Sequence, residues 1–508
     1  MELLSSLLPG SASPPKLDQL PPEMLDFTLH KTTGTLAPRL GRLSLPKRRS
    51  ILTPSFIGNT SRGVIPHITQ DNFSKSLGLD GVYVALEDFI EKIPQKTPPV
   101  FQYDVSEPLR KFIALPEDTL LVLGPRRNPP IPSAIHSTNK ELGVLTSVGF
   151  KALSSEYYAA AARKLQPDIV VGLADIPFGQ DRVGIKRKDK MSDRTETWVR
   201  DIIAKKATLD KGEPSWGIFA PILPIDRDLQ SWYLEHLVDD MADKISGVAI
   251  YDAYLLDDLP EELHRLPRLS FQAPASPQEI LRQVGLGMDI FTVPFLTDAT
   301  DAGIALDFTF PAPQKDTTSS SRQDLGLDMW SDTHATSVTP LSEGCQCYAC
   351  TKHHRAYIQH LLAAKEMLGW VLIQIHNHAV LSFFFTGVRK SIDADTFDAD
   401  VTAFERFYES ALPEKTGQGP RVRGYQFKAE EHAKPEKKNQ RVFTKYDDAK
   451  IAELRLAAAH GQQPGSKPAM QDVIDDEALV GLVGLEEVDV NGARQVESLS
   501  LEDDATKR

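Results

Sequence analysis

Three cysteines have the residue type and the spacing to bind a metal ion. Cys345, Cys347 and Cys350 lie in the string GCQCYAC, and the chain contains no other cysteine. An odd, closely spaced set cannot form a disulfide framework, and in a chain otherwise free of thiols it indicates a reducing compartment and a metal site. Zinc prefers four sulfur or imidazole ligands in a tetrahedron, and the Cys-x-Cys-x2-Cys spacing supplies three thiolates from one tight turn.

A histidine farther along the chain must supply the fourth ligand. His376 follows Cys350 by 26 positions, which is enough for one helix out and a return. Four other histidines compete with it, namely His353, His354, His360 and His378. Three thiolates and one imidazole leave no open coordination position. We therefore predict one zinc ion, bound by the three cysteines and His376, with a structural role. Three reduced core cysteines without a metal are the alternative.

The elements that position these ligands are expected to be helices and parallel strands. TKHHRAYIQHLLAAKEMLG (351–369) has the pattern of a helix, and WVLIQIHNHAV after it fits a strand or a helix. Upstream, nearly continuous apolar runs predict strands at 119–125, 167–175, 217–223, 246–252, 267–273 and 288–295. Amphipathic stretches between them predict helices at 154–166, 229–245 and 276–285.

Strands that are apolar on both faces are typical of parallel sheets covered by helices. Repeated strand–helix units over this length predict the α/β class and, within it, a (β/α)8 TIM barrel. A doubly wound open sheet is the alternative, but the chain has no Gly-rich dinucleotide or phosphate loop to support it.

Length and composition define the rest of the organisation. The chain has 508 residues, of which 41% are hydrophobic and 25% charged, as in soluble globular proteins. Its net charge of -13 argues against a generic nucleic-acid coat protein, although a local basic face stays open. No apolar run reaches 18 residues, so we expect no integral membrane segment. We predict a flexible N-terminus (1–25), a barrel domain (26–410) with a zinc subdomain at about 340–380, a disordered insertion (411–447), and a helix with an acidic tail (448–508).

The segment CQCYACTKHHRAYIQHLLAAKEMLGWVLIQIHN resembles the zinc-binding segment of the tRNA-guanine transglycosylases. In that family a Cys-x-Cys-x2-Cys cluster precedes a helix of the form RAYxxHLLxxxExLG, and an Ile-His-Asn supplies the fourth ligand. PRLGRLSLPKRRSILTPSFIGNTSRGVIP is similar to the family's opening hairpin and first barrel strand. The resemblance implies a (β/α)8 barrel with an inserted zinc subdomain. It also implies a role in replacing guanine at wobble position 34 of tRNAs with GUN anticodons, which in eukaryotes installs queuine.

The positions that carry the family's chemistry differ in this chain. Base exchange needs a carboxylate nucleophile and a second acid/base carboxylate nearby. In the string FTVPFLTDATDAG, Thr292 stands where the resemblance places the nucleophilic Asp. Asp298 and Asp301 stand where the family has arginines that hold anticodon phosphates, and two such reversals of charge would repel tRNA locally. Asp175, in PDIVVGLAD, matches the Asp that contacts the exchanged base.

Two further strings of the family are missing. The Asp-Ser-Gly-Gly-(Tyr/Phe)-Gln string that supplies the second carboxylate is replaced by a region containing LPEDTLLVLGPRRNPP, and YDAYLLDDLP (251–260) lies near the place of the Gly-Gly-Leu base-binding loop. The resemblance therefore implies the non-catalytic subunit of a heterodimer whose other subunit is catalytic. The alternatives are an active transglycosylase using Asp289, Asp298 or Asp301, and a zinc-stabilised RNA-binding scaffold unrelated to base exchange.

Basic clusters and one apolar face suggest where partners bind. Lys186, Arg187 and Lys188 follow a strand end on the side where barrels bind substrates, so they are our candidate tRNA contacts, although charge runs in loops are often only solvated. The helix predicted at 351–369 has more apolar residues than one barrel flank needs, so we expect part of it to be buried against the catalytic subunit. The resemblance implies a cytoplasmic location with peripheral association at the mitochondrial outer membrane.

Overall fold

The computed structural model describes residues 25–420, apart from 35, 91–96, 133–136, 147–148, 181, 211–213 and 314–320. Residues 1–24 of the predicted N-terminus (1–25), residues 421–447 of the predicted insertion (411–447), and the predicted helix and acidic tail (448–508) lie outside the described residues. Those assignments therefore stay predictions.

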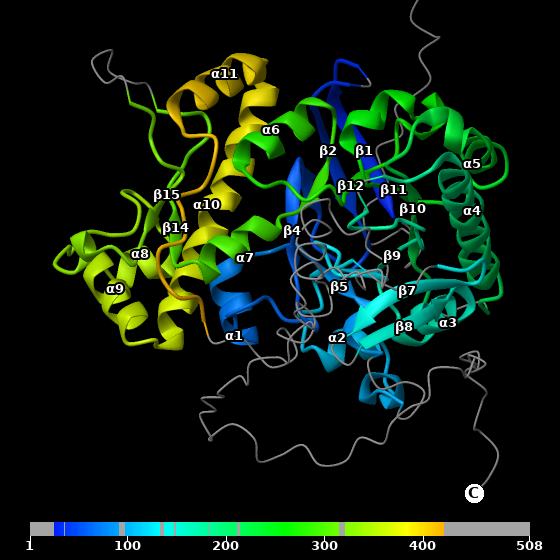
Figure 1. Cartoon of the computed structure of the whole chain (residues 1–508), viewed down its shortest axis with the longest axis horizontal. Coiled ribbons are helices and arrows are strands. Elements are labelled where there is room, and N and C mark those ends of the chain that lie inside the picture. The colour runs from blue at the N-terminus through cyan, green and yellow to red at the C-terminus, as the bar shows by residue number, and fades with distance from the viewer. Residues whose placement is uncertain are drawn as a thin grey trace, which may run out of the picture. The chain divides into compact units, whose positions relative to one another are not determined.

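Eight parallel strands close into a barrel, which confirms the predicted (β/α)8 fold (Figure 1). The barrel closes where β13 pairs with β4, with Phe291 opposite Phe56. The strands are β4 (Ser55–Asn59), β5 (Gly81–Ala85), β6 (Leu120–Gly124), β9 (Ile169–Val171), β10 (Gly217–Ile222), β11 (Gly247–Ile250), β12 (Arg268–Ser270) and β13 (Ile290–Thr292). All six strands predicted from apolar runs lie in this barrel.

The barrel strands bury side chains on both faces, which is why their sequences read as continuous apolar runs. In β10 all six residues are buried. Phe219 belongs to the cluster inside the barrel, whereas its neighbours Ile218 and Ala220 belong to the larger cluster outside it. The alternation follows from the two-residue repeat of a strand.

Helices cover the outside of the barrel: α1 to α6 lie in connections between consecutive barrel strands, and α7 follows the last barrel strand. They are α1 (Gln70–Asn72), α2 (Pro108–Phe112), α3 (Ser155–Leu165), α4 (Ile185–Ala207), α5 (Arg227–Asp239), α6 (Pro277–Gly285) and α7 (Pro294–Asp301). After β11, two short 3-10 turns, Ala253–Asp258 and Glu261–Leu263, take the place of a helix. Of these, α3, α5 and α6 match the three predicted helices.

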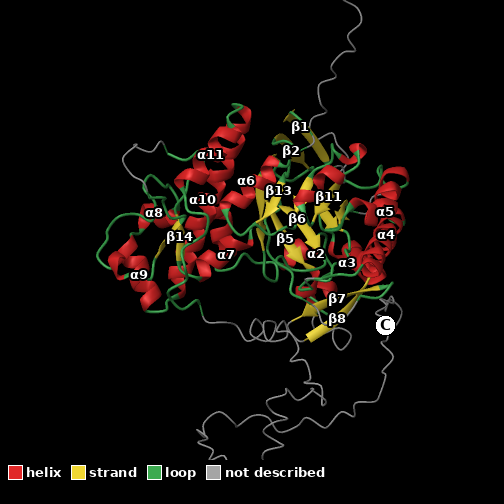
Figure 2. Ribbon diagram, turned by 45° about the horizontal axis from the view of Figure 1, so that its top comes forward, coloured by secondary structure: helices red, strands yellow, loops and turns green. Residues whose placement is uncertain are grey.

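Two antiparallel elements are added to the barrel (Figure 2). A sheet of β1 (Asp26–Thr32), β2 (Arg39–Ser44) and β3 (Ile51–Thr53) contributes Leu43 and Ile51 to the cluster inside the barrel. A hairpin of β7 (Glu141–Thr146) and β8 (Gly149–Ser154) is inserted between β6 and α3.

The segment that is predicted to bind zinc forms a subdomain beside α7, which we call the zinc subdomain (Figure 1). It contains β14 (Ile304–Leu306), β15 (Gly326–Asp328), α8 (Tyr348–Lys352), α9 (Arg355–Ala363) and α10 (Met367–Asp393), and α11 (Phe397–Phe407) follows it. The single helix expected at 351–369 is therefore interrupted. His354 begins α9 as its cap, and Lys365 ends that segment with a φ of 58°.

The segment WVLIQIHNHAV is helical and lies inside α10. By length and composition α10 could cross a membrane, but 72% of its most apolar stretch is buried inside the protein. Core helices of soluble proteins meet the same two criteria.

Candidate functional site

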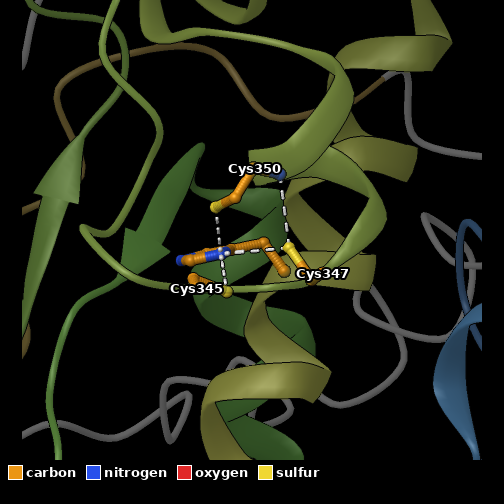
Figure 3. A group of neighbouring side chains, drawn as sticks. Cys345, Cys347 and Cys350 are labelled. Atoms are coloured by element: carbon orange, nitrogen blue, oxygen red, sulfur yellow. Dashed lines mark hydrogen bonds between the residues drawn. The ribbon is translucent and has the colours of Figure 1, made fainter.

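The structure brings the three cysteines and His376 together in one cluster (Figure 3). Their sulfur and nitrogen atoms all lie within 4.8 Å of one another. Nδ1 of His376 is 3.8, 3.6 and 3.3 Å from the sulfurs of Cys345, Cys347 and Cys350. Zinc–sulfur and zinc–nitrogen bonds of usual length, at a tetrahedral angle, would separate sulfur from nitrogen by about 3.6 Å. The residues therefore fit a four-coordinate ion such as zinc.

Local structure explains how the four ligands converge. Cys347 is the residue before α8, and its sulfur accepts a hydrogen bond from the N–H of Cys350 at 3.4 Å, so two ligands are fixed in one helix cap. His376 is fully buried in the middle of α10. Its Nε2 lies 2.8 Å from the carbonyl of Leu306, and because that nitrogen donates to the carbonyl, Nδ1 is left to face the sulfurs.

Charges within the cluster shift the pKa of its members. Burial lowers the pKa of His376, but hydrogen bonds with Cys345 and Cys350 raise it more, to about 9. Hydrogen bonds from Cys345 and Cys347 lower the pKa of the Cys350 thiol well below its usual range. A metal ion held by Nδ1 of His376 would take the place of the proton on that nitrogen.

The competing histidines have other roles. His353 stacks on Tyr357 with ring centroids 5.4 Å apart, and Nδ1 of His354 accepts a hydrogen bond from the N–H of Tyr357. His378 stacks on Phe56, and burial lowers its pKa to about 3. His360 is exposed. Across the part of the chain that the structure describes, no other group of histidine, cysteine and acidic side chains has ligand spacing.

The position expected for a nucleophile carries a buried hydroxyl. Thr292 ends β13 and is fully buried. Its Oγ1 accepts a hydrogen bond from Nδ2 of Asn128, and it lies 3.5 Å from the carbonyl oxygen of Ser270. A threonine oxygen that is held in this way by neutral partners has no adjacent base to activate it.

Aromatic side chains fill the mouth of the barrel, at the carboxyl ends of its strands. We call Tyr83, Phe178, Tyr251 and Phe271 the aromatic plug. Tyr251 stacks on Phe271 at 5.2 Å between ring centroids, and Tyr83 meets Phe271 edge-on at 5.3 Å. Phe178 lies 6.4 Å from Tyr251, and the Arg126 guanidinium lies 5.2 Å from the Phe178 ring. The cavity that remains is ≈ 10 Å³, about the space for one water molecule and far less than a nucleobase needs.

Comparison with known proteins adds the family. A family profile described as queuine tRNA-ribosyltransferase matches residues 35–410. The chain belongs to the queuine tRNA-ribosyltransferase family. It is 36% identical over 381 residues to the queuine tRNA-ribosyltransferase accessory subunit 2 of Schizosaccharomyces pombe. The matched region covers 75% of this chain and 84% of the relative. Proteins of the same name from Drosophila mojavensis and Danio rerio are 27% and 25% identical, over 70% and 68% of this chain and 86% and 90% of their own lengths.

Within this queuine tRNA-ribosyltransferase barrel, Asp175 is enclosed by cations. It is fully buried and accepts hydrogen bonds from Arg187 at 2.5 and 2.7 Å and from Arg194 at 2.9 Å. Burial raises the pKa of Asp175, but these hydrogen bonds lower it more, so its pKa lies below the usual value. The carboxylate is therefore occupied by protein partners.

The three candidate tRNA contacts lie in the first turn of α4, where a loop was expected. The guanidinium of Arg187 is engaged by Asp175, and Nζ of Lys188 lies 3.6 Å from Asp226. Lys186 is exposed. Of the three, Lys186 has the charge most open to a ligand from solution.

Other carboxylates considered for catalysis do not line the cavity at the plug. Asp289 precedes β13, at the amino end of the barrel, where Arg39 binds it in a buried ion pair. Asp301 pairs with Nε2 of His67 at 2.5 Å, and Asp298 is exposed on the same helix, α7.

Sequence reasoning did not identify the aromatic plug. Its signal was present, because Tyr251 and Phe271 come directly after the apolar cores of two predicted strands. A large ring at that position of a barrel strand faces the place where substrates of such barrels bind. Gly124 shows how closely the plug is packed, since a Cβ added there would lie 2.0 Å from the Tyr83 hydroxyl.

Proposed function

We propose that this chain is the non-catalytic subunit of a heterodimeric queuine tRNA-ribosyltransferase and supports the exchange of guanine for queuine at wobble position 34. The aromatic plug is the observation that carries the proposal, since it leaves about one water's space where a base would bind. The buried Thr292 at the nucleophile position and the names of the three relatives support it. Catalysis would then belong to the partner subunit.

We also propose that the cluster of three cysteines and His376 holds one zinc ion with a structural role. Zinc bound by four protein ligands has no open position for water or substrate. It would join the cap of α8 to the middle of α10, two segments that meet at His376. In such a site the free energy of metal binding contributes directly to folding.

For the partner, we propose a docking surface on the outer side of α8, α9 and the start of α10. Four apolar side chains here are between 37% and 50% exposed: Tyr348, Tyr357, Met367 and Leu368. Leu361 and Leu362, on the apolar face of the same segment, are buried in the chain's own core. Apolar and aromatic residues clustered on a surface are typical of protein–protein interfaces.

We further propose that Lys186 contacts tRNA in the assembled complex, with Arg187 and Lys188 at its side. The direction of the α4 dipole supports a ligand-binding role, because cations in the first turn of a helix are unfavourable without an anionic partner.

We also propose a cytoplasmic location with peripheral association at the mitochondrial outer membrane. Subcellular fractionation with and without a carbonate wash tests it.

Incorporation of labelled queuine into tRNA tests the proposed function. The assay compares this chain alone, the catalytic subunit alone, and the two mixed in equal amounts. We expect incorporation only in the mixture, or far more of it there. Incorporation by this chain alone would overturn the proposal, and the aspartates of α7 would then be the first candidates for a nucleophile.

A further inference from the structure

Asn377, the neighbour of the ligand His376, is a fully buried amide with three partners on two other elements. Its Oδ1 accepts a hydrogen bond from the N–H of Leu306 at 2.8 Å. Its Nδ2 donates to the carbonyl of Ile304 at 3.0 Å and to Oγ1 of Thr300 at 2.9 Å. The first two partners lie in β14 and the third lies in α7.

The backbone of Leu306 is consequently held at both of its polar groups by one turn of α10. Asn377 binds its N–H, and Nε2 of His376 binds its carbonyl at 2.8 Å. That carbonyl fixes which ring nitrogen of His376 faces the cysteines. A partner of this kind, which orients a ligand without touching the metal, typically changes metal affinity by 10- to 100-fold when it is lost.

The same amide extends the metal centre into the barrel. Thr300 is buried in α7, which begins two residues after Thr292 at the end of the last barrel strand. The next residue, Asp301, contacts His67 in the connection after β4. A continuous series of hydrogen bonds thus leads from the ligand His376 through Leu306 and Asn377 to a helix at the barrel mouth.

We propose that Asn377 is a positioning residue for the metal centre and that, through it, metal binding orders α7 and β14. This inference rests on the proposed zinc site. It adds that the ion stabilises a part of the barrel as well as the subdomain that supplies its ligands. Buried amides with every hydrogen bond satisfied hold one arrangement of their neighbours, because each unpaired alternative leaves a buried polar group unsatisfied.

Zinc release and hydrogen exchange together test this proposal on the full chain. The zinc content of the parent protein is measured first. The rate of zinc transfer to an excess of chromophoric chelator is then compared for the parent, Asn377→Leu, Thr300→Val and Gln374→Leu. Gln374→Leu is the matched control, because it removes another buried amide from α10 one turn away, on a side chain whose Oε1 has no partner. Cobalt-substituted forms report ligand geometry through their absorption bands.

We expect Asn377→Leu to release zinc about tenfold faster or more and to shift the cobalt bands, with Gln374→Leu close to the parent. Thr300→Val should keep the parent's release rate but raise hydrogen exchange in α7. In the parent, chelation alone should raise hydrogen exchange in peptides covering 294–306 and leave exchange in β10 and β11 unchanged. This test needs no variant.

Equal rates of zinc release from Asn377→Leu and Gln374→Leu would overturn the positioning role of Asn377. Unchanged hydrogen exchange in α7 after chelation would overturn the coupling between the metal and α7. A parent without bound zinc would overturn the zinc proposal and this inference with it.

Discussion

Asp175 and Thr292 lie near the carboxyl ends of two barrel strands, and protein partners occupy the polar atoms of both. Arg187 and Arg194 enclose the Asp175 carboxylate, and Asn128 binds the Thr292 hydroxyl. A side chain in such surroundings must lose these partners before it can bind a substrate, at a cost of about 1–3 kcal/mol for each buried group left unsatisfied. At the residue scale, these two positions stabilise the barrel.

Removing one cation from Asp175 should therefore destabilise the protein in a pH-dependent way. We expect Arg187→Gln to lower the free energy of unfolding by about 2 kcal/mol at pH 7, since a buried carboxylate loses one of its two cationic partners. The pKa of Asp175 is lowered in the folded protein. Its stabilising contribution is therefore present above the unfolded pKa of about 3.9 and is lost as the pH falls through the folded pKa.

Urea unfolding between pH 7 and pH 3 measures the free energy of unfolding of the parent and of Arg187→Gln. The difference from the parent should shrink below about pH 4, whereas Lys186→Gln, one residue away and exposed, should show almost none. A difference that is the same at pH 3 and pH 7 would contradict this account.

At the scale of elements, hydrophobic runs predicted the strands well and the helices less well. The six predicted strands are apolar on both faces, a pattern typical of parallel strands that are covered by other elements on each side. β5 was missed although VYVA is apolar, because the run is short and polar turns adjoin it. α4 was missed because its many charges mask a stripe of buried residues, including Met191, Thr195, Trp198 and Ile202, at helical spacing.

Tertiary contacts decided what the sequence pattern left open in the zinc subdomain. The helical pattern of 351–369 continues through His353 and His354, but α8 ends at Lys352, and His354 caps a new helix. For the fourth ligand, spacing alone left five histidines. In the structure His376 is the one that lies beside the three sulfurs, and the carbonyl of Leu306, 70 residues away in the chain, orients its ring. The aromatic plug is likewise built from separate strands, so no local pattern reveals that its rings meet.

If the cluster binds zinc, its affinity should depend on pH, because the His376 imidazole carries a proton at neutral pH without the ion. The pKa of His376 is raised to about 9, so at neutral pH the imidazole must lose a proton to bind zinc. We expect the apparent affinity to rise about tenfold for each pH unit between pH 6 and pH 8 for each proton displaced. Competition with a chelator of known proton affinity measures this slope. A pH-independent affinity would show that His376 is already neutral or does not bind the metal.

The first turn of α4 makes its own prediction for tRNA binding. If Lys186 contacts a phosphate, Lys186→Ala should weaken binding by the complex and reduce the slope of log affinity against log salt by slightly less than one. Lys205→Ala is the matched control, since it removes the same charge from the last turn of the same helix. Filter binding over a range of salt concentrations measures both. Equal slopes for the two variants would remove Lys186 from the interface.

At the scale of the described molecule, a complete barrel is retained although its mouth is filled. Buried apolar side chains close the barrel and attach its helices, and the polar contacts of Asn377 connect it to the zinc subdomain. In Figure 1, α8 and α9 lie at the edge of the described structure, away from the barrel, and the exposed Tyr348 and Tyr357 belong to these helices. A scaffold of this kind can present a surface to a partner without an active site of its own.

This arrangement predicts that assembly depends on the exposed apolar side chains of the zinc subdomain. We expect Leu368→Glu to weaken binding of the catalytic subunit by at least about tenfold, because a charge would replace an apolar contact in the buried part of an interface. Trp232→Glu is the matched control, since Trp232 is 61% exposed on α5, a helix that lies across the barrel from α8 and α9 in Figure 1. Sedimentation velocity over a concentration series measures the dissociation constant, and queuine incorporation by each mixture should fall in parallel for Leu368→Glu alone. If Trp232→Glu disrupts the pair and Leu368→Glu does not, the partner binds the α5 side, and the docking surface proposed on the zinc subdomain is wrong.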